Sequence, residues 1–156
     1  MAKETKEIPV LGIKKQQEDA RYEFEDYNNI KLFAYLNPEK IKSVESRLIN
    51  NPISQRTIST NREIPYVKIF TEELLLIPVF LEFTIPVGYE LVINPDNDLV
   101  MKKGLTIISN SLFYTDNKAF IIVANYADTT KNISHNELLV IGKLSKTQIF
   151  DIETIN

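Results

Sequence analysis

Hydrophobic positions recur at every second residue over most of the chain after Ile64, a period that predicts β-strands rather than helices. Apolar and β-branched runs are separated by turn-forming residues, for example at 86–88 and 94–97. The predicted strands cover residues 64–70, 74–85, 89–94, 98–101, 105–109, 119–125, 130–133 and 138–144. Short strands divided by such turns are typical of a β-sandwich or barrel.

One short helix is predicted before these strands. Asn37 is a favourable N-cap, and Pro38 suits the first helical position. The helix then runs over about residues 37–49, where Ile41, Val44 and Leu48 form one apolar stripe. A short amphipathic helix of this kind usually packs on a sheet.

The first 30 residues are polar and mixed in charge, with aromatic residues at Tyr22, Phe24 and Tyr27. This spacing predicts an extended arm whose rings dock on the core or on a partner, and a disordered tail is the alternative. We therefore divide the chain into an N-terminal arm with the short helix, residues 1–60, and a β domain, residues 61–156.

Composition narrows the classes of function. The 156 residues, 44% of them hydrophobic, suit one compact domain with an extension. Absence of cysteine excludes disulfides and thiolate chemistry, and a single histidine makes no metal cluster. A net charge of −3 without a basic block disfavours nucleic-acid binding. Residues 1–12 resemble neither a signal peptide nor a membrane span, so we expect a soluble protein not secreted by a signal peptide.

Several segments resemble, in order and almost without gaps, the core of the trimeric dUTPase and dCTP deaminase superfamily. Residues 77–78 and 85–90 are similar to its I-P-T-G and I-P-x-G-Y patterns, and residues 94–104 to P-R-S-G-L-A-x-K-x-G. Residues 121–125 and 136–141 are similar to its later strand ending in N and to G-D-R-I-A-Q-L. The resemblance implies a mainly β, dUTPase-like sandwich or jelly-roll barrel with one short N-terminal helix. Abundant Asn and Ile suit an AT-rich, phage-encoded source.

The residues that would perform hydrolysis in this family are missing. Its P-R-S-G segment supplies an arginine and a serine to the phosphates, but here those positions are Asp96 and Asn97, with Asp98 in place of the glycine. Two acids repel a triphosphate and remove the electrostatic stabilisation that catalysis needs. The resemblance therefore implies a site that has degenerated.

Two further patterns of the family are also altered. Its G-x-I-D-x-D-Y-R-G pattern carries an aspartate that activates water and a tyrosine that stacks on the deoxyribose, whereas residues 111–118 have Tyr114 before Asp116 and no glycine. The glycine-rich motif that closes over the phosphates is absent, because no glycine follows Gly142. We expect no catalytic residue, no cofactor and no metal.

Other chemistry is less well supported. Ser134, His135 and Asp128 or Asp151 are the members of a possible triad, but a turn histidine at the surface is the simpler interpretation. A second possibility is a site for a hard cation, with oxygen donors from Asn94, Asp96, Asn97, Asp98 and Asp116. A plain turn is the favoured interpretation of this segment.

Leu74 and Leu76 belong to the most apolar run of the chain, so they join Tyr22, Phe24 and Tyr27 as candidate interface residues. The leading hypothesis is a non-catalytic structural subunit that forms a trimer or higher ring and joins other structural proteins. The phage virion is the assembly suggested, as an auxiliary capsid, decoration or connector subunit, so the location is virion or host cytoplasm. The alternatives are a nucleotide-binding regulatory module that stacks a base on Tyr114 or Tyr89, and a divergent dUTPase with Asp116 as base.

Overall fold

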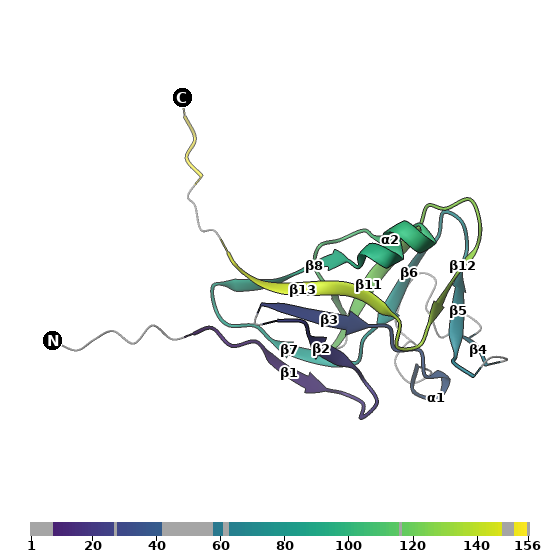
Figure 1. The fold of residues 1–156 in the computed structure, drawn as a ribbon. Helices are drawn as coiled ribbons and strands as arrows, with labels where there is room; N and C mark the ends of the chain where they lie inside the picture. The colour runs from purple at the N-terminus through teal and green to yellow at the C-terminus, as the bar shows by residue number, and fades with distance from the viewer. Residues whose placement is uncertain are drawn as a thin grey trace.

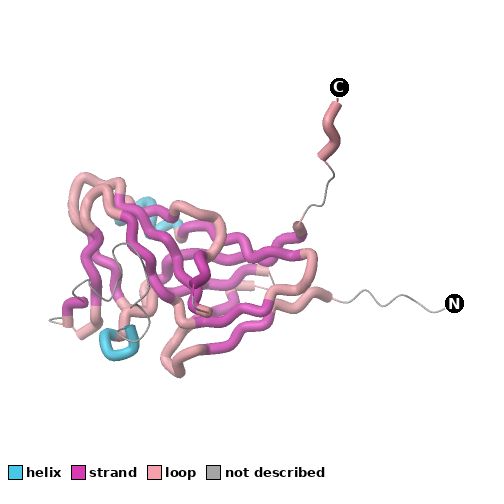
Figure 2. Tube along the Cα trace, turned by 180° about the vertical axis from the view of Figure 1, so that it is seen from behind, coloured by secondary structure: helices cyan, strands magenta, loops and turns pink. Residues whose placement is uncertain are grey.

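The computed structural model describes residues 8–26, 28–41, 58–60, 63–115, 117–147 and 152–155, and these are mainly β, as expected (Figures 1 and 2). The described strands are β1 (Gly12–Lys15), β2 (Tyr22–Phe24), β3 (Asn29–Phe33), β4 (Ile58–Ser59), β5 (Tyr66–Ile69), β6 (Leu74–Pro78), β7 (Leu81–Thr84), β8 (Tyr89–Pro95), β9 (Leu105–Ile107), β10 (Phe113–Thr115), β11 (Lys118–Asn125), β12 (Lys131–Ser134) and β13 (Leu138–Lys146). The described helices are α1 (Pro38–Ile41) and α2 (Asn97–Lys103). No helix among these residues is long and apolar enough to cross a membrane.

The strands pair in four antiparallel groups. One sheet has the order β2-β3-β13-β8, a second has β10-β11-β6 with β9 also paired to β11, a third has β12-β5-β4, and β1 pairs with β7. In Figure 1 the β12-β5-β4 group lies at one end, and α2 lies beside β8 and β13. The early strands β1 and β3 thus pair with β7 and β13, which belong to the second half of the chain. The division of the chain at residue 60 stays a prediction.

The core lies between the sheets and takes the inward-facing residue of each alternating pair. Leu75 and Ile77 of β6 lie opposite Val123 and Ile121 of β11, and all four are fully buried. Strand β13 has a glycine, Gly142, between β3 and β8. A Cβ added there would lie 3.1 Å from a methyl group of Ile30 and 3.2 Å from one of Leu91. An alanine at this point would therefore force the side chains of Ile30 and Leu91 to move by a few tenths of an ångström.

Residues 74–85 form two strands, not the single strand predicted. Phe80 has a φ of 53° and breaks the run between β6 and β7. After this break β7 pairs with β1, whereas β6 pairs with β11. Backbone groups at the break remain satisfied, since Val79 N–H donates to Ala119 O at 3.2 Å and Phe80 O accepts from Gln16 N–H at 2.9 Å.

The predicted strand at residues 98–101 is wrong, because this segment belongs to α2. Asp96 caps the helix start by accepting a hydrogen bond from Asp98 N–H, and Gly104 ends the helix with a φ of 68°. Lysines at 102 and 103 suit the last turn. The apolar run Leu99 to Met101 looked like a strand, but only Leu99 is buried in the helix.

Other boundaries differ less from the prediction. The helix start at Asn37 is confirmed, since Asn37 Oδ1 accepts from Glu39 N–H at 3.2 Å, whereas the predicted end lies outside the described residues. Strand β10 was not predicted. It pairs with β11 through a tight turn in which Asn117 has a φ of 61°.

Candidate functional site

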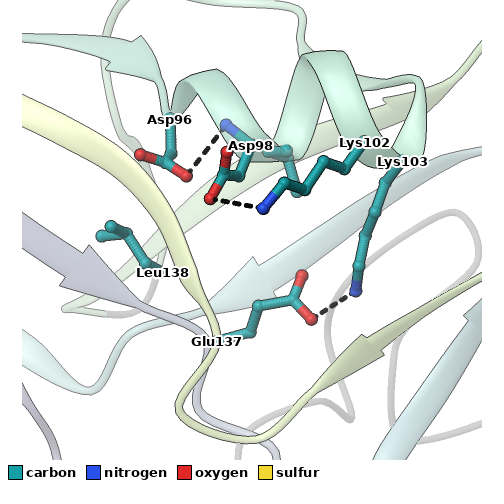
Figure 3. Close-up of a pocket in the computed structure, with 7 residues that line it drawn as sticks. Asp96, Asp98, Lys102, Lys103, Glu137 and Leu138 are labelled. Carbon is teal, nitrogen blue, oxygen red and sulfur yellow. Dashed lines mark hydrogen bonds and ion pairs between the residues drawn. The ribbon is translucent and has the colours of Figure 1, made fainter.

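A pocket of about 310 Å³ lies where β8 passes into α2 and faces the turn between β12 and β13 (Figure 3). Two of the positions singled out from the sequence, Asp96 and Asp98, belong to it. Its lining residues are Asp96, Asp98, Leu99, Lys102, Lys103, Glu137 and Leu138. The neighbouring Asn97 is exposed and is not part of the lining.

Asp96 has a structural role at the entrance of α2. Its backbone is extended, with φ −62° and ψ 141°, and its N–H donates to Leu139 O at 2.9 Å. Its Oδ2 accepts from Asp98 N–H at 3.2 Å, which satisfies one of the free donors of the helix start. The carboxylate therefore occupies the place in which a helix N-terminus would otherwise offer an N–H group to an anion.

The other charges of the pocket form two ion pairs, one within α2 and one between α2 and the β12–β13 turn. Lys102 Nζ lies 3.4 Å from Asp98 Oδ2, but both side chains are about three-quarters exposed, so this pair adds little stability. Lys103 contacts Glu137 and also donates to Asn132 O at 2.7 Å, and this pair is much less exposed. Lys103 thereby ties the end of α2 to β12 and to the β12–β13 turn.

The balance of charge in the pocket does not favour a polyphosphate. Three carboxylates and two lysines line it, which gives a formal charge of −3 plus 2, or −1. Both lysines already contact carboxylates of the pocket. An incoming phosphate would have to displace those acids and would meet Asp96 at the helix start.

The cation alternative also finds little geometry to support it. Among the described residues no group of three or more His, Cys, Asp or Glu side chains could hold a metal ion. Asp96 and Asp98 lie at a helix start and not in the plain turn that we expected, and Asp116 lies outside the described residues.

The β10–β11 hairpin lies apart from this pocket. Tyr114 is opposite Ala119 on β11, is half exposed, and is absent from the pocket lining. Partial burial raises the pKa of the Tyr114 hydroxyl. The hairpin turn is held by Gln16, whose Nε2 donates to Asn117 O at 2.7 Å. Asp96 and Asp98 on one side and Tyr114 on the other, which the sequence resemblance predicted to belong to one former site, are therefore not brought together within this pocket.

His135 lies in the β12–β13 turn but is not a free surface histidine. Its Nδ1 accepts a hydrogen bond from Leu36 N–H at 2.8 Å, and its ring meets the edge of Tyr35 with centroids 5.2 Å apart. Burial lowers the pKa of His135, and the negative charge of Asp19 opposes that shift. The turn position of His135 is confirmed, but the residue is only partly exposed and its imidazole holds the segment after β3.

The polar group around His135 was missed from the sequence. Tyr35 OH donates to Asp19 Oδ1 at 2.6 Å, and Asn37 Nδ2 donates to Asp19 Oδ2 at 3.3 Å. Burial alone would raise the pKa of Asp19. The hydrogen bonds to its carboxylate lower the pKa by more than burial raises it, so the net shift is downward. For the suggested triad, Asp128 is exposed in another turn and Asp151 lies outside the described residues.

Asn125 is a buried polar residue of the fold. Its Nδ2 donates to Ile69 O at 2.9 Å and Thr129 O at 3.1 Å, while its Oδ1 accepts from Ala127 N–H at 2.9 Å. The side chain therefore fixes the turn after β11 and joins it to β5. A strand ending in Asn at this point is explained by folding, not by ligand binding.

The candidate interface residues are placed differently from one another. Leu74 and Phe24 are exposed by 48% and 63%, Leu76 is half-buried, and Tyr22 packs against the core. Tyr27 lies outside the described residues. Leu74 and Leu76 both belong to the outward-facing row of β6.

No protein-family model and no curated protein sequence matches the chain. Solved structures do match it over nearly its whole length. The dUTPase of Streptococcus mutans aligns with a TM-score of 0.61 at 17% identity, covering 90% of this chain and 98% of the enzyme. The dUTPase of phage phi11 of S. aureus gives 0.66 at 13% identity, and that of Staphylococcus bacteriophage 80alpha gives 0.64 at 11% identity, each covering 94% of this chain and 96% of the phage protein.

Proposed function

We propose that this chain, which has a dUTPase-like fold, is a non-catalytic member of that fold. We propose further that it acts as a structural subunit of an assembly. The observation that carries the proposal is the set of acids at the start of α2. Asp96 caps the helix at the position where the resembling pattern has an arginine for the phosphates, Asn97 stands at the position of its serine, and Asp98 stands in place of its glycine. A fold that keeps the helix but places anions at its entrance is poorly suited to a nucleoside triphosphate.

The β10–β11 hairpin supports the same proposal. Residues 111–118 contain no glycine and have Tyr114 before Asp116, whereas the resembling pattern has its aspartate before its tyrosine. A hairpin with this order of acid and tyrosine does not match a site that needs a positioned general base.

The assembly part of the proposal rests on exposed apolar side chains and on analogy. Ile8, Val10, Ile152 and Ile155 are each at least 73% exposed near the two chain ends. Apolar side chains exposed in this way are available for contact with a partner. Among the structural neighbours are phage proteins, and we propose a phage particle as the assembly, in which this chain is an auxiliary capsid, decoration or connector subunit.

The test of the proposal is an assay of magnesium-dependent pyrophosphate release from dUTP and dCTP by the purified chain. The S. mutans dUTPase serves as the positive control under the same conditions. We expect no turnover above the uncatalysed rate. Turnover that scales with protein concentration, and that is lost in the Asp116→Asn variant, would show that the chain is a divergent dUTPase and would overturn the proposal.

A second candidate function is a nucleotide-binding regulatory module. The observation that favours it is the likeness to the 80alpha phage dUTPase, which is described as controlling the transfer of virulence genes by a proto-oncogenic G protein-like mechanism. Tyr114 or Tyr89 would stack the base. This candidate requires saturable dUTP binding in calorimetry that Tyr114→Ala or Tyr89→Ala abolishes, with Tyr126→Ala, also exposed, as the matched control.

A further inference from the structure

The turn between β12 and β13, residues 135–137, is tied to the segment that follows β3. Asn136 N–H donates to Ala34 O at 2.8 Å, and Glu137 O accepts from Ala34 N–H at 2.9 Å. Asn136 has a φ of 63°, a conformation that few residues other than glycine adopt, so the turn is tight. Any movement of one of its residues is therefore passed to the other two.

Two side chains of this turn contact different parts of the molecule. His135 Nδ1 accepts from Leu36 N–H at 2.8 Å. Glu137 contacts Lys103 at the end of α2 and belongs to the lining of the pocket there (Figure 3). Because only one residue separates His135 from Glu137, a shift of the turn at His135 reaches the wall of the pocket.

The contact between His135 and Leu36 exists only while the imidazole is neutral. A ring nitrogen that accepts a hydrogen bond carries no proton, whereas both nitrogens of an imidazolium carry protons and donate. Protonation at Nδ1 would set two N–H groups against each other, and Leu36, which is fully buried, would lose its acceptor. Histidine ordinarily takes up its proton near pH 6.5, so this contact is sensitive to mild acid.

The groups that surround His135 offer the protonated ring another partner. The negative charge of Asp19, in the loop between β1 and β2, favours the imidazolium. Asp19 also accepts from Tyr35 OH at 2.6 Å, and the Tyr35 ring lies against His135. From the side of β5 the contact is a backbone carbonyl, Pro65 O, which accepts from His135 N–H at 2.8 Å. Glu137, on the turn itself, is already paired with α2. Asp19 is therefore the acceptor toward which a protonated His135 turns.

We propose that the β12–β13 turn is a pH-sensitive hinge that couples His135 to the pocket beside α2. With a neutral imidazole, the turn is held on Leu36 and rests against Lys103. On protonation the ring leaves Leu36 N–H and turns toward Asp19, the turn moves, and the contact of Glu137 with Lys103 weakens. A hinge of this kind works within one chain and does not depend on the assembly function.

The composition of the chain gives a direct test by nuclear magnetic resonance. His135 is its only histidine, so the ring C2–H resonance reports the protonation of this residue alone. The chain has four glycines, so selective ¹⁵N-glycine labelling gives four amide signals. Gly104 ends α2 beside Lys103, and Gly88, in the turn between β7 and β8, is the matched control. We expect the Gly104 amide to shift with the same midpoint as His135, below pH 6.5, and the Gly88 amide to stay in place.

Two variants separate a hinge from a fixed structural contact. In His135→Asn an amide oxygen can accept from Leu36 N–H but does not titrate, so the Gly104 amide should stay in place between pH 8 and pH 5. Asp19→Asn removes the charge that favours the imidazolium, so the midpoint of His135 should move to lower pH. A midpoint that is unchanged in Asp19→Asn would show that Asp19 is not the second partner and would overturn the proposed movement.

Hydrogen exchange of the Leu36 amide tests the first step of the movement. After correction for the intrinsic rate, its protection in the natural chain should fall about tenfold or more between pH 7.5 and pH 5, and His135→Asn should show no such fall. Far-ultraviolet circular dichroism at both pH values should be the same, because the change is local. Equal protection at both pH values, a Gly104 amide that stays in place while His135 titrates, or unfolding of the whole chain over this range would each overturn the proposal.

Discussion

Replacing His135 by phenylalanine tests the structural role that the hydrogen bonds assign to this residue. Phenylalanine keeps an aromatic ring beside Tyr35 but has no acceptor for Leu36 N–H, which His135 Nδ1 accepts at 2.8 Å. A buried N–H group left without a partner costs about 1–3 kcal/mol. We therefore expect His135→Phe to lower the free energy of unfolding by about 2 kcal/mol at pH 8.

The matched control is His135→Asn. Its amide oxygen takes the place of Nδ1 and can accept from Leu36 N–H, while the ring contact with Tyr35 is lost. An aromatic pair contributes about 0.5–1.5 kcal/mol beyond its buried area. We expect His135→Asn to be less destabilised than His135→Phe at pH 8, because it keeps the acceptor.

The same residue makes stability depend on pH. Burial lowers the pKa of His135 below the usual 6.5, so the folded chain prefers the neutral imidazole and the unfolded chain takes up the proton first. The stability from neutral His135 is present above pH 6.5 and is lost as pH falls through the lower folded pKa. Asp19, whose folded pKa is also lowered, loses its contribution only at more acidic pH, below 3.8.

Urea unfolding at pH 8 and at pH 5, followed by far-ultraviolet circular dichroism, measures both the loss of the hydrogen bond and the pH dependence of stability. The natural chain should lose stability between these pH values, and both His135→Phe and His135→Asn should lose less. If His135→Phe is destabilised by under about 0.5 kcal/mol at pH 8, or if it keeps the full acid dependence, then Leu36 N–H is not held by His135 and the reasoning fails.

Three further substitutions test other parts of the fold by the same unfolding measurement. Asn125→Leu leaves two backbone carbonyls and one N–H without their partner, so we expect a loss of about 3 kcal/mol or more, and a loss below 1 kcal/mol would contradict the buried role of Asn125. Asp96→Ala should cost about 1 kcal/mol by removing the cap of α2, while Asp96→Asn should keep most of it; equal losses would argue against capping. Gly142→Ala should cost about 1–3 kcal/mol because the new methyl group meets Ile30 and Leu91, and an unchanged midpoint would show that these strands can separate freely.

The strands were predicted well where an apolar run lies between turn residues and poorly where single residues decide the backbone. The unbroken apolar run of β11 located this strand almost to its ends, because residues on both of its faces are buried. The strand predicted at 98–101 was a helix, since capping by Asp96 and Gly104 outweighed an apolar run. The break at Phe80 depends on a positive φ, which periodicity does not reveal.

The candidate site was found only as far as its residues are close in sequence. Asp96 and Asp98 lie two residues apart and were recognised together. Glu137 completes the pocket from 34 residues beyond Lys103, and His135 meets Leu36 across 99 residues, so neither contact follows from a local pattern. Pairing of β13 with β8 brings Glu137 close to α2, and pairing of β13 with β3 brings His135 close to Leu36.

The most direct test of the account is the solution mass of the natural chain by light scattering, with dUTP hydrolysis assayed on the same sample. We predict a stable assembly of three or more copies that releases no pyrophosphate from dUTP in the presence of magnesium. An assembly that hydrolyses dUTP would contradict the loss of catalysis. A monomer at every concentration would contradict the assembly function.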